Sequence, residues 1–317
     1  MLLTLARWLS PNFFALAASS GQPILITIPY SHYNELARWA LQLVGARFVE
    51  FGYSPLQHVL PVLAARLCGR KEHLSSSSKI ERPPAAGDAS DRALLHAPRG
   101  APTAVPLLVL PDGRVLPDSW AIGAASGLAP ITDPSLMHTY DAVLGPLTRQ
   151  WIYFYLLKPA AAPLWDALIT RDRHWIWRAL YALGLRGAIR KRLTAAFRSD
   201  EPSAMATCRA RLRAVIDELG ASRVRARPGA FLNGDAISLE DVALAALVAP
   251  LVLPPNYCEG KYAYVLDAIA PADRQFAAEL AEWRATAVGE YVLWLYAHHR
   301  LGGTAALPAG QLPAPKL

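Results

Sequence analysis

A serine lies at a corner between a predicted strand and a predicted helix, where a hydroxyl can act on a bound thiol. Residues 24–28, ILITI, predict a buried strand, and apolar residues at three-to-four spacing from Leu36 to Val44 predict a helix. Ser31 falls between them, where free N–H groups and the positive end of the helix dipole gather. A hydroxyl there can donate a hydrogen bond to a thiolate and favour the ionised thiol. An ordinary N-cap serine would occupy the same position, so both interpretations are open.

Two more features frame a predicted β-hairpin in VPLLVLPDGRVLPDS, residues 105–119. Asp112-Gly113 between two apolar runs is a strong hairpin signal. Pro106 enters the first strand, where the Val105–Pro106 bond can be cis; an ordinary edge-strand proline is the alternative. Asp118 and Ser119 follow at a predicted helix start. They either cap that helix or bind a carboxylate together with its N–H groups.

The elements around these residues predict two domains. The length of 317 residues, with 53% hydrophobic and 18% charged residues, is that of a globular chain with two cores. Residues 47–51 predict a second strand and residues 56–67 a helix that Pro61 should bend or break. Residues 68–103 show no periodicity and predict a disordered insertion. Helices are predicted at 136–157, 165–183, 185–197, 203–219, 239–248, 272–285 and 289–300, before a Pro/Gly-rich tail.

The N-terminal segment has two interpretations. Residues 1–34 contain no Asp or Glu. Residues 1–22 fit either an organelle transit peptide, for a chloroplast or a mitochondrion, or a helix on the surface of a cytoplasmic protein. Folded structure is expected to begin at Pro23.

Neither a disulfide framework nor a metal site is expected. Cys68, Cys208 and Cys258 are far apart in the sequence, and the adjacent His298 and His299 lack a third ligand. No apolar run is long enough to span a bilayer.

The net charge of +7 is concentrated in the second half of the chain. A solvated helical face explains it, and attraction of anionic ligands or a membrane surface is the alternative. Nucleic acid is not an expected partner, because no nucleic-acid motif accompanies the charge. The basic residues are Arg171, Arg173, Arg178, Arg186, Arg190, Lys191, Arg192, Arg198, Arg209, Arg211, Arg213, Arg223, Arg225 and Arg227.

Together, these motifs resemble the glutathione transferase superfamily over residues 23–300. SHYNELARWAL, residues 31–41, is similar to the family's first-helix signature, in which Ser, Cys or Tyr serves the glutathione thiol. Residues 105–119 are similar to its cis-proline, strand hairpin and acidic-Ser pair. GAFLNGDAISLEDVALAALVAPLVLPP, residues 229–255, is similar to the buried helix and capping box of its C-terminal domain; Ser238 and Asp241 form that capping-box pattern. Residues 283–300 resemble the last helices of a Ser-type bacterial and algal branch.

The resemblance implies a fold and a domain plan. An α/β thioredoxin-like, glutathione-binding domain is expected at residues 23–130, with the insertion at 69–103. An all-α helical domain is expected at residues 134–300 and a disordered tail at 301–317.

The resemblance also implies site residues and partners. Ser31 would stabilise the glutathione thiolate, flanked by His32 and Tyr33, although His32 as a surface residue is the alternative. Val105, with Pro106, would pair with the cysteinyl backbone, and Asp118 and Ser119 would hold the γ-glutamyl group. A small apolar electrophile or a peroxide would bind near Trp151 and Tyr155, for which core packing is the alternative. Glutathione would be the co-substrate, no metal would be required, and a homodimer is allowed; detoxification and stress response are the associated roles.

Two departures from the family pattern leave other functions open. The insertion is expected near the glutathione-binding side, and GAASGLAPITDP, residues 123–134, predicts a shortened third helix that would loosen the γ-glutamyl grip. The alternatives to a transferase or peroxidase are a non-catalytic binding or scaffold protein and a membrane-surface protein that uses the basic helices.

Overall fold

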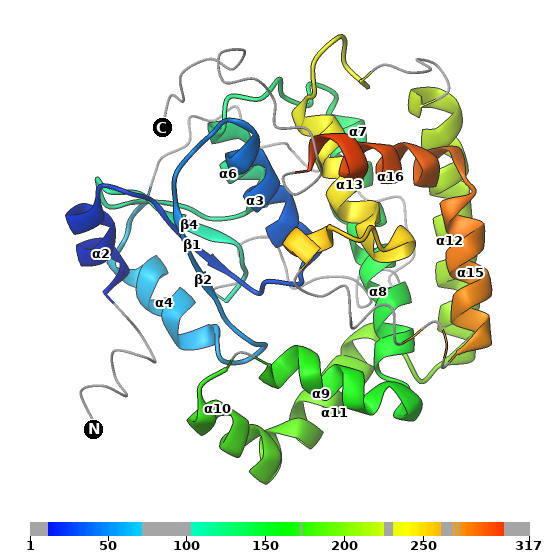
Figure 1. The fold of residues 1–317 in the computed structure, drawn as a ribbon, viewed down its shortest axis with the longest axis horizontal. Helices are drawn as coiled ribbons and strands as arrows, with labels where there is room; N and C mark the ends of the chain where they lie inside the picture. Colours follow the sequence, from blue (N-terminus) through cyan, green and yellow to red (C-terminus); the bar gives the residue numbers. More distant parts are fainter. Residues whose placement is uncertain are drawn as a thin grey trace. The chain divides into compact units, whose positions relative to one another are not determined.

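The computed structural model describes residues 12–71, 103–171, 173–224, 231–260, 269, 271 and 273–300. Contacts between residues divide the chain into two compact units, with the division between Leu128 and Ala129. The described part of the first unit is a mixed sheet with helices, and that of the second unit is helical (Figure 1). The insertion predicted at 69–103 and the tail predicted at 301–317 fall almost entirely outside the described residues.

The described residues of the first unit form a five-stranded sheet in the order β2-β1-β4-β5-β3. The strands are β1 (Ile24–Thr27), β2 (Val49–Gly52), β3 (Arg70–Lys71), β4 (Leu107–Val109) and β5 (Arg114–Leu116). β1 is parallel to β2 and antiparallel to β4, β4 is antiparallel to β5, and β3 is parallel to β5. Helix α3 (His32–Leu43) connects β1 to β2, α4 (Val59–Cys68) follows β2, and α6 (Ser119–Ala125) follows β5. This order of elements is thioredoxin-like, and with the helical second unit it confirms the predicted fold class.

Alternating side chains of the central strands build a core on each face of the sheet. Ile24 and Ile26 point to one face, where Phe13 and Ala17 of helix α2 (Phe13–Ser20) join them. Leu25 points to the other face, toward residues of α3 and α6. This two-residue period is what a strand buried on both faces requires. The sheet is therefore a middle layer, with α2 and α4 on one face and α3 and α6 on the other.

Helices α2 and α4 differ from the sequence predictions: a helix was one interpretation of residues 1–22, but α2 packs on the sheet, and α4 starts three residues later than predicted. α2 precedes Pro23, and Phe13 is only 2% exposed, so folded structure begins earlier than predicted. α4 begins at Val59, which puts Pro61 in the first turn. The N–H groups there have no intrahelical partner, so Pro61 neither bends nor breaks the helix.

The hairpin prediction is confirmed. The N–H of Gly113 donates to the Leu110 carbonyl at 3.0 Å, and the N–H of Leu110 donates to the Arg114 carbonyl at 2.9 Å. Gly113 has a φ of 86°, a left-handed conformation that glycine adopts without steric cost.

The second unit is built from helices joined by short turns. Among the described residues, the central α13 (Leu239–Val252) packs against α8 and α16. The α-helices are α7 (Pro134–His138), α8 (Gly145–Leu156), α9 (Ala162–Thr170), α10 (Trp175–Leu180), α11 (Arg186–Phe197), α12 (Pro202–Leu219), α13, α15 (Arg274–Arg284) and α16 (Ala287–His299). The other helical segments are the π-helical η2 (Thr139–Leu144), η4 (Tyr181–Leu185) and η5 (Gly220–Val224) and the 3₁₀-helical η3 (Pro159–Ala161) and η6 (Tyr257–Gly260).

The predicted capping box starts α13. The Asp241 N–H donates to the Ser238 hydroxyl, and the Ser238 N–H donates to the Asp241 carboxylate at 2.7 Å. The helix continues past the predicted end at residue 248 and through Pro250, with every side chain buried. Pro250 has no N–H, so the helix lacks the one intrahelical hydrogen bond that this residue would donate to the carbonyl four positions earlier. Burial of each large aliphatic side chain contributes about 1.5–3 kcal/mol, and the sum over the buried side chains of α13 outweighs that loss.

One predicted helix is two. The sequence predicted a single helix over 165–183, but α9 ends at Thr170 and α10 begins at Trp175. The ring of His174 caps the new start by accepting a hydrogen bond from the Ile176 N–H at 3.3 Å. A capping histidine is not a usual sequence signal for a helix start, so the break went unpredicted. Among the described helices, none is both long enough and apolar enough to cross a bilayer.

A carboxylate of α15 ties together the aromatic core of the second unit. Glu279 accepts hydrogen bonds from Trp151 Nε1 at 2.7 Å and pairs with Arg209 at 2.8 Å. Burial alone would raise the pKa of this carboxyl, but hydrogen bonds from Trp151 and Arg209 outweigh it, so the net pKa is lowered.

Replacement of Glu279 by Gln is expected to lower the free energy of unfolding by about 1–2 kcal/mol at neutral pH, the difference between a charged and a neutral hydrogen-bonded group. Because the folded-state pKa is depressed, the contribution is present above the unfolded pKa of about 4.3 and is lost as the pH falls through the folded pKa. Urea unfolding at neutral and at acidic pH measures both values. Glu282→Gln is the control, because Glu282 lies on the same helix as Glu279 but forms an exposed pair with Arg213 of α12; the expected loss is under about 1 kcal/mol. A Glu279→Gln loss that stayed constant with pH would contradict this account.

Candidate functional site

The register of the sheet brings three segments of the first unit to one edge. Ile26 of β1 lies opposite Leu107 of β4, so the segment after β1 runs alongside the segment before β4. Leu116 of β5 lies opposite Leu108, so the segment after β5 reaches the same edge. Those segments hold Ser31, Val105-Pro106 and Asp118-Ser119 respectively, so the predicted site residues of the first unit converge there. The Val105–Pro106 peptide bond is cis, as predicted.

Ser31 is the N-cap of α3, but its side chain makes no capping hydrogen bond. Its backbone is committed: the N–H donates to the Ile28 carbonyl at 2.9 Å, and the carbonyl accepts from the Glu35 N–H at 2.9 Å. The residue is partly exposed. An N-cap serine normally satisfies one of the first N–H groups of its helix, which is the usual reason for its presence. The capping interpretation of the Ser31 hydroxyl is therefore not supported, and the hydroxyl stays at the positive end of α3.

Backbone contacts fix the corner that carries Ser31. Asn34 donates from Nδ2 to the Ile28 carbonyl at 2.7 Å, so Ile28 accepts hydrogen bonds from both Ser31 and Asn34. On the other side, the Pro29 ring packs against Gly52 of β2. A Cβ on Gly52 would lie 2.4 Å from the Pro29 Cγ, which makes glycine necessary for this close approach.

A buried ion network that the sequence analysis did not identify supports the same corner. Arg38 Nη1 donates to Glu35 at 2.6 Å, and its Nε and Nη2 donate to the two oxygens of Glu50 at 2.9 and 2.6 Å. Arg38 also donates to the Pro29 carbonyl at 3.3 Å, and the Thr27 hydroxyl donates to Glu50 at 2.6 Å. Arg38 and Glu35 are 2% and 0% exposed. The spacing of three residues between Glu35 and Arg38 was visible in the sequence, but Glu50 joins them through the fold.

His32 and Tyr33 form the first turn of α3, beside Ser31. The His32 side chain is 3% exposed, so the alternative of a surface residue is wrong. The two rings lie 4.6 Å apart between centroids. Their contact with a bound thiol stays a prediction.

Asp118 caps α6 with one carboxylate oxygen. Its Oδ1 accepts hydrogen bonds from the Trp120 N–H at 3.0 Å and the Ala121 N–H at 2.8 Å. The capping interpretation of Asp118 is therefore confirmed, and Ser119 is buried as the first residue of the helix. α6 ends at Ala125, in agreement with the shortened third helix predicted from residues 123–134.

An arginine of α4 links two of the converging segments. Arg66 Nη2 donates to the Ala104 carbonyl at 3.1 Å and to the Pro117 carbonyl at 2.9 Å. These two carbonyls directly precede Val105 and Asp118. Burial lowers the pKa of Arg66 and the nearby Asp118 charge raises it, with a net lowering. The guanidinium thus couples the position of the segment before β4 to that of the segment after β5.

Trp151 and Tyr155 lie in the interior of the second unit. Their side chains are 0% and 1% exposed, and both rings contact Phe276, at centroid distances of 5.5 and 4.9 Å. Core packing accounts for both aromatic residues. Their part in an electrophile pocket stays a prediction. In the parts of the chain that the structure describes, no three His, Cys, Asp or Glu side chains gather as metal ligands would.

Solved structures similar to this chain are glutathione transferases. A glutathione transferase of Phanerochaete chrysosporium is 15% identical, with a TM-score of 0.43 over 84% of this chain and 97% of its own. A glutathione S-transferase of Methylobacillus flagellatus with glutathione bound is 14% identical, with a TM-score of 0.36 over 86% and 98%. The Tau class enzyme of mango is 13% identical, with a TM-score of 0.37 over 87% and 99%. Because these identities are at most 15% and the TM-scores at most 0.43, the similarity adds nothing about the fold beyond what the order of the strands establishes. No protein-family model matches the chain, and no curated protein sequence matches it significantly.

Substitution of Arg38 by Met is expected to reduce the free energy of unfolding by about 3–5 kcal/mol, because it leaves the Glu35 and Glu50 carboxylates without their shared cation. Chemical denaturation measures this loss. Arg47→Met replaces an exposed arginine of the same unit and is expected to change stability by less than about 0.5 kcal/mol. Equal losses in the two variants would mean that the buried network does not hold the corner.

Proposed function

We propose that this protein is a glutathione-dependent transferase in which Ser31 stabilises the glutathione thiolate for attack on a small apolar electrophile or a peroxide. The observation that carries the proposal is the Ser31 side chain, which begins α3 without capping it. A serine hydroxyl that the helix does not use, at the positive end of that helix, suits an incoming anion. The register of β1, β4 and β5 provides support, because it brings Val105 and Asp118 to the same edge.

The chemistry of the conjugation step follows from thiol ionisation. Glutathione loses its thiol proton to solvent, and the Ser31 hydroxyl donates a hydrogen bond to the resulting thiolate. The thiolate electron pair then forms a sulfur–carbon bond to the electrophile, and the leaving group departs with the electron pair of the bond that breaks. Because the hydrogen bond favours the thiolate, it lowers the thiol pKa and raises the reactive fraction at neutral pH.

The remainder of glutathione would lie along the converging segments. The partly exposed Val105 would pair its backbone with the cysteinyl residue, next to Pro106. At the start of α6, the Asp118 oxygen that does not cap the helix would receive the γ-glutamyl ammonium, since opposite charges attract strongly in a partly buried site. Ser119, the buried first residue of α6, would hold the γ-glutamyl group together with Asp118.

Replacement of Ser31 by Ala is expected to lower kcat/KM for conjugation of glutathione to a generic aryl halide by about 10- to 100-fold. A hydrogen bond to a charged group contributes about 1.5–3 kcal/mol, and each 1.36 kcal/mol is a factor of ten. At saturating glutathione, the same loss should move the midpoint of the pH–rate profile upward by about one to two units, because the bound thiol ionises less readily. Stopped-flow or steady-state absorbance at several pH values gives both readings.

Ser31→Thr keeps the hydroxyl and is expected to retain most of the rate. Ser135→Ala removes an exposed serine at the start of α7 and should leave both rate and midpoint unchanged. If Ser31→Ala and Ser135→Ala reacted at the wild-type rate with the wild-type midpoint, the role of Ser31 would be refuted.

Replacement of Arg66 by Gln is expected to raise the KM for glutathione by up to about 30-fold while kcat changes by less than about threefold. Loss of two hydrogen bonds to the Ala104 and Pro117 carbonyls frees the segments that would bind the tripeptide, at about 1 kcal/mol each, and leaves Ser31 in place. Initial rates at varied glutathione measure the two constants separately. Arg114→Gln, on β5, is the control, because its exposed pair with Asp112 lies in the hairpin. An Arg66→Gln variant that lost kcat alone would argue against a positioning role.

A further inference from the structure

The outer face of α10 and η4 carries large apolar side chains in water. Trp175 is 69% exposed, Leu180 is 49% exposed and Leu183 is 84% exposed. Of the five large hydrophobic side chains that are exposed among the described residues, these are three, and they fall within nine consecutive positions. A cluster of this kind on a globular protein marks an interaction surface more often than chance exposure does.

The opposite face of the same segment is firmly docked. Trp177 donates from Nε1 to the Ile169 carbonyl of α9 at 3.2 Å, and the Tyr181 hydroxyl donates to Asp166 at 2.7 Å. Arg186 pairs with the same Asp166 at 2.6 Å. Trp177 and Tyr181 are 5% and 3% exposed, one helical turn apart on the inner side. The exposed Trp175 is therefore held outward by the docking of its neighbours.

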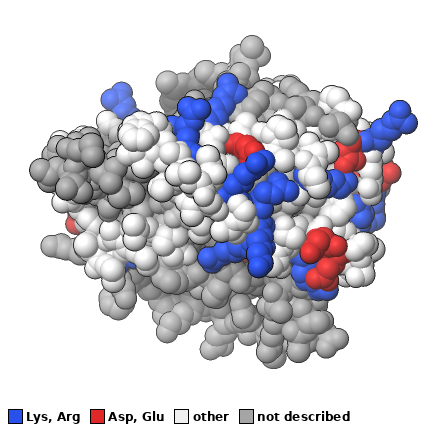
Figure 2. All heavy atoms as spheres, turned by 90° about the horizontal axis from the view of Figure 1, so that it is seen from below, with Lys and Arg blue, Asp and Glu red and all other residues white. Residues whose placement is uncertain are grey.

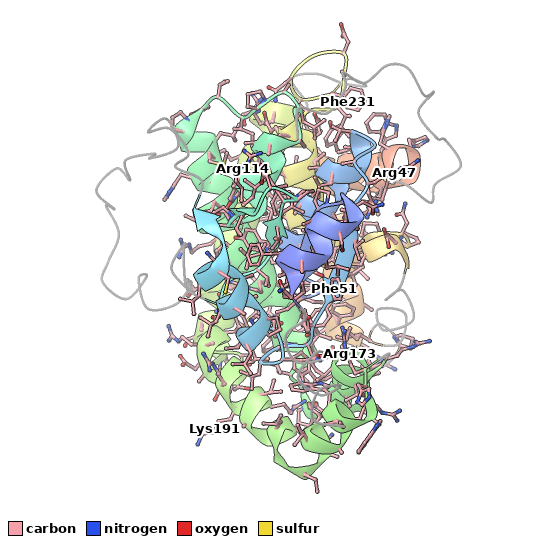
Figure 3. The ribbon with its side chains drawn as sticks, turned by 90° about the vertical axis from the view of Figure 1, so that its left-hand side faces the viewer. Arg47, Phe51, Arg114, Arg173, Lys191 and Phe231 are labelled. Atoms are coloured by element: carbon pink, nitrogen blue, oxygen red, sulfur yellow. The ribbon has the colours of Figure 1, made fainter. Side chains whose placement is uncertain are left out.

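Positive charge surrounds these apolar residues. Residues 171–197 contain seven Lys and Arg against one acidic residue, Asp172, so this segment supplies most of the net charge of +7. Arg178, Lys191 and Arg192 are exposed, and no ion pair of theirs is found among the described residues. Figure 2 views the end of the second unit where α10 and α11 lie in Figure 1, and Lys and Arg atoms are more abundant there than those of Asp and Glu. The Lys191 side chain points outward from α11 (Figure 3).

We propose that this surface, defined by Trp175, Arg178, Leu180, Leu183, Lys191 and Arg192, binds the face of an anionic lipid bilayer. Tryptophan places its apolar ring and its N–H group at the boundary between acyl chains and headgroups, and leucine enters the acyl region. Lys and Arg beside them meet the negative headgroups. The juxtaposition of an exposed indole, exposed leucines and exposed cations is the chemistry of an interfacial helix.

Other occupants match the surface less well. A second copy of the chain would bring the same positive charge against itself, which like-charge repulsion opposes. A nucleic acid would neutralise the cations, but its phosphate backbone gives Leu180 and Leu183 no apolar contact. An anionic bilayer satisfies both the charge and the apolar side chains.

Flotation of the full chain with vesicles tests the proposal. The protein is expected to float with phosphatidylcholine vesicles that contain phosphatidylserine, to remain unbound with phosphatidylcholine alone, and to dissociate in high salt. The double variant Lys191→Gln/Arg192→Gln is expected to weaken partitioning by about 25-fold, at about fivefold for each charge. On binding, Trp175 should shift the protein's tryptophan fluorescence to shorter wavelength, and Trp175→Ala should lose that shift and weaken binding.

Matched variants distinguish binding through this surface from binding driven by the overall positive charge or by any exposed apolar side chain. Arg47→Gln/Arg274→Gln removes two other exposed positive charges, and Leu67→Ala removes another exposed leucine at 84% exposure. Both controls should float like the wild type, and the thermal unfolding midpoints of all variants should agree. The proposal is overturned if the wild type does not bind anionic vesicles, if the Arg47→Gln/Arg274→Gln control weakens binding as much as the Lys191→Gln/Arg192→Gln variant, or if double-stranded DNA but not lipid retains the protein. Because the readout contains no glutathione, its outcome is independent of the function proposed for Ser31.

Discussion

Ile26 of β1 lies opposite Leu107 of β4, and this register determines which segments meet at the edge of the sheet. A slip by one residue would turn Ile24 and Ile26 toward α3 and α6, and Leu25 toward α2 and α4, so both cores depend on the pairing. The same pairing carries the segment before β4 alongside the corner that follows β1. The site is thus a consequence of how the two cores are filled, because the register that fills them also aligns the segments.

Charge inside the first unit adds a second constraint. Arg38 is buried between Glu35 and Glu50 and reaches the Pro29 carbonyl, two residues before Ser31. Taking these charges out of water is unfavourable, and only the full set of hydrogen bonds offsets it. Such a network tolerates little displacement, so it holds the corner in one conformation. Arg66 acts in the same way on the other two segments through the carbonyls of Ala104 and Pro117.

Local patterns predicted the features that local forces decide. The Asp112-Gly113 turn, the Ser238 capping box and the buried strand at residues 24–28 are set by neighbours in the chain, and each is found in the structure. Features that depend on the fold were not predictable. Glu50 joins Arg38 only through the pairing of β1 with β2, and Trp175 and Trp177 differ in exposure only because α9 packs on one side.

At the site itself, the sequence located Ser31 at the corner but left its hydroxyl undecided between cap and donor. The conformation of the side chain argues against the cap, since no capping hydrogen bond forms, and leaves the donor role as a prediction. The opposite holds for Asp118, which the family resemblance had assigned to the γ-glutamyl group: here the cap does form, and it uses one of the two carboxylate oxygens. The two helix starts look alike in sequence, and rotamers that depend on the tertiary setting separate them.

The central claim is that the hydroxyl of Ser31 stabilises a bound thiolate, and titration of that thiolate by its ultraviolet absorbance tests it without any electrophile. Glutathione mixed with excess protein should ionise with a thiol pKa at least about one unit below the ordinary value near 8.5. A bound glutathione that ionises at its ordinary pKa would contradict the account.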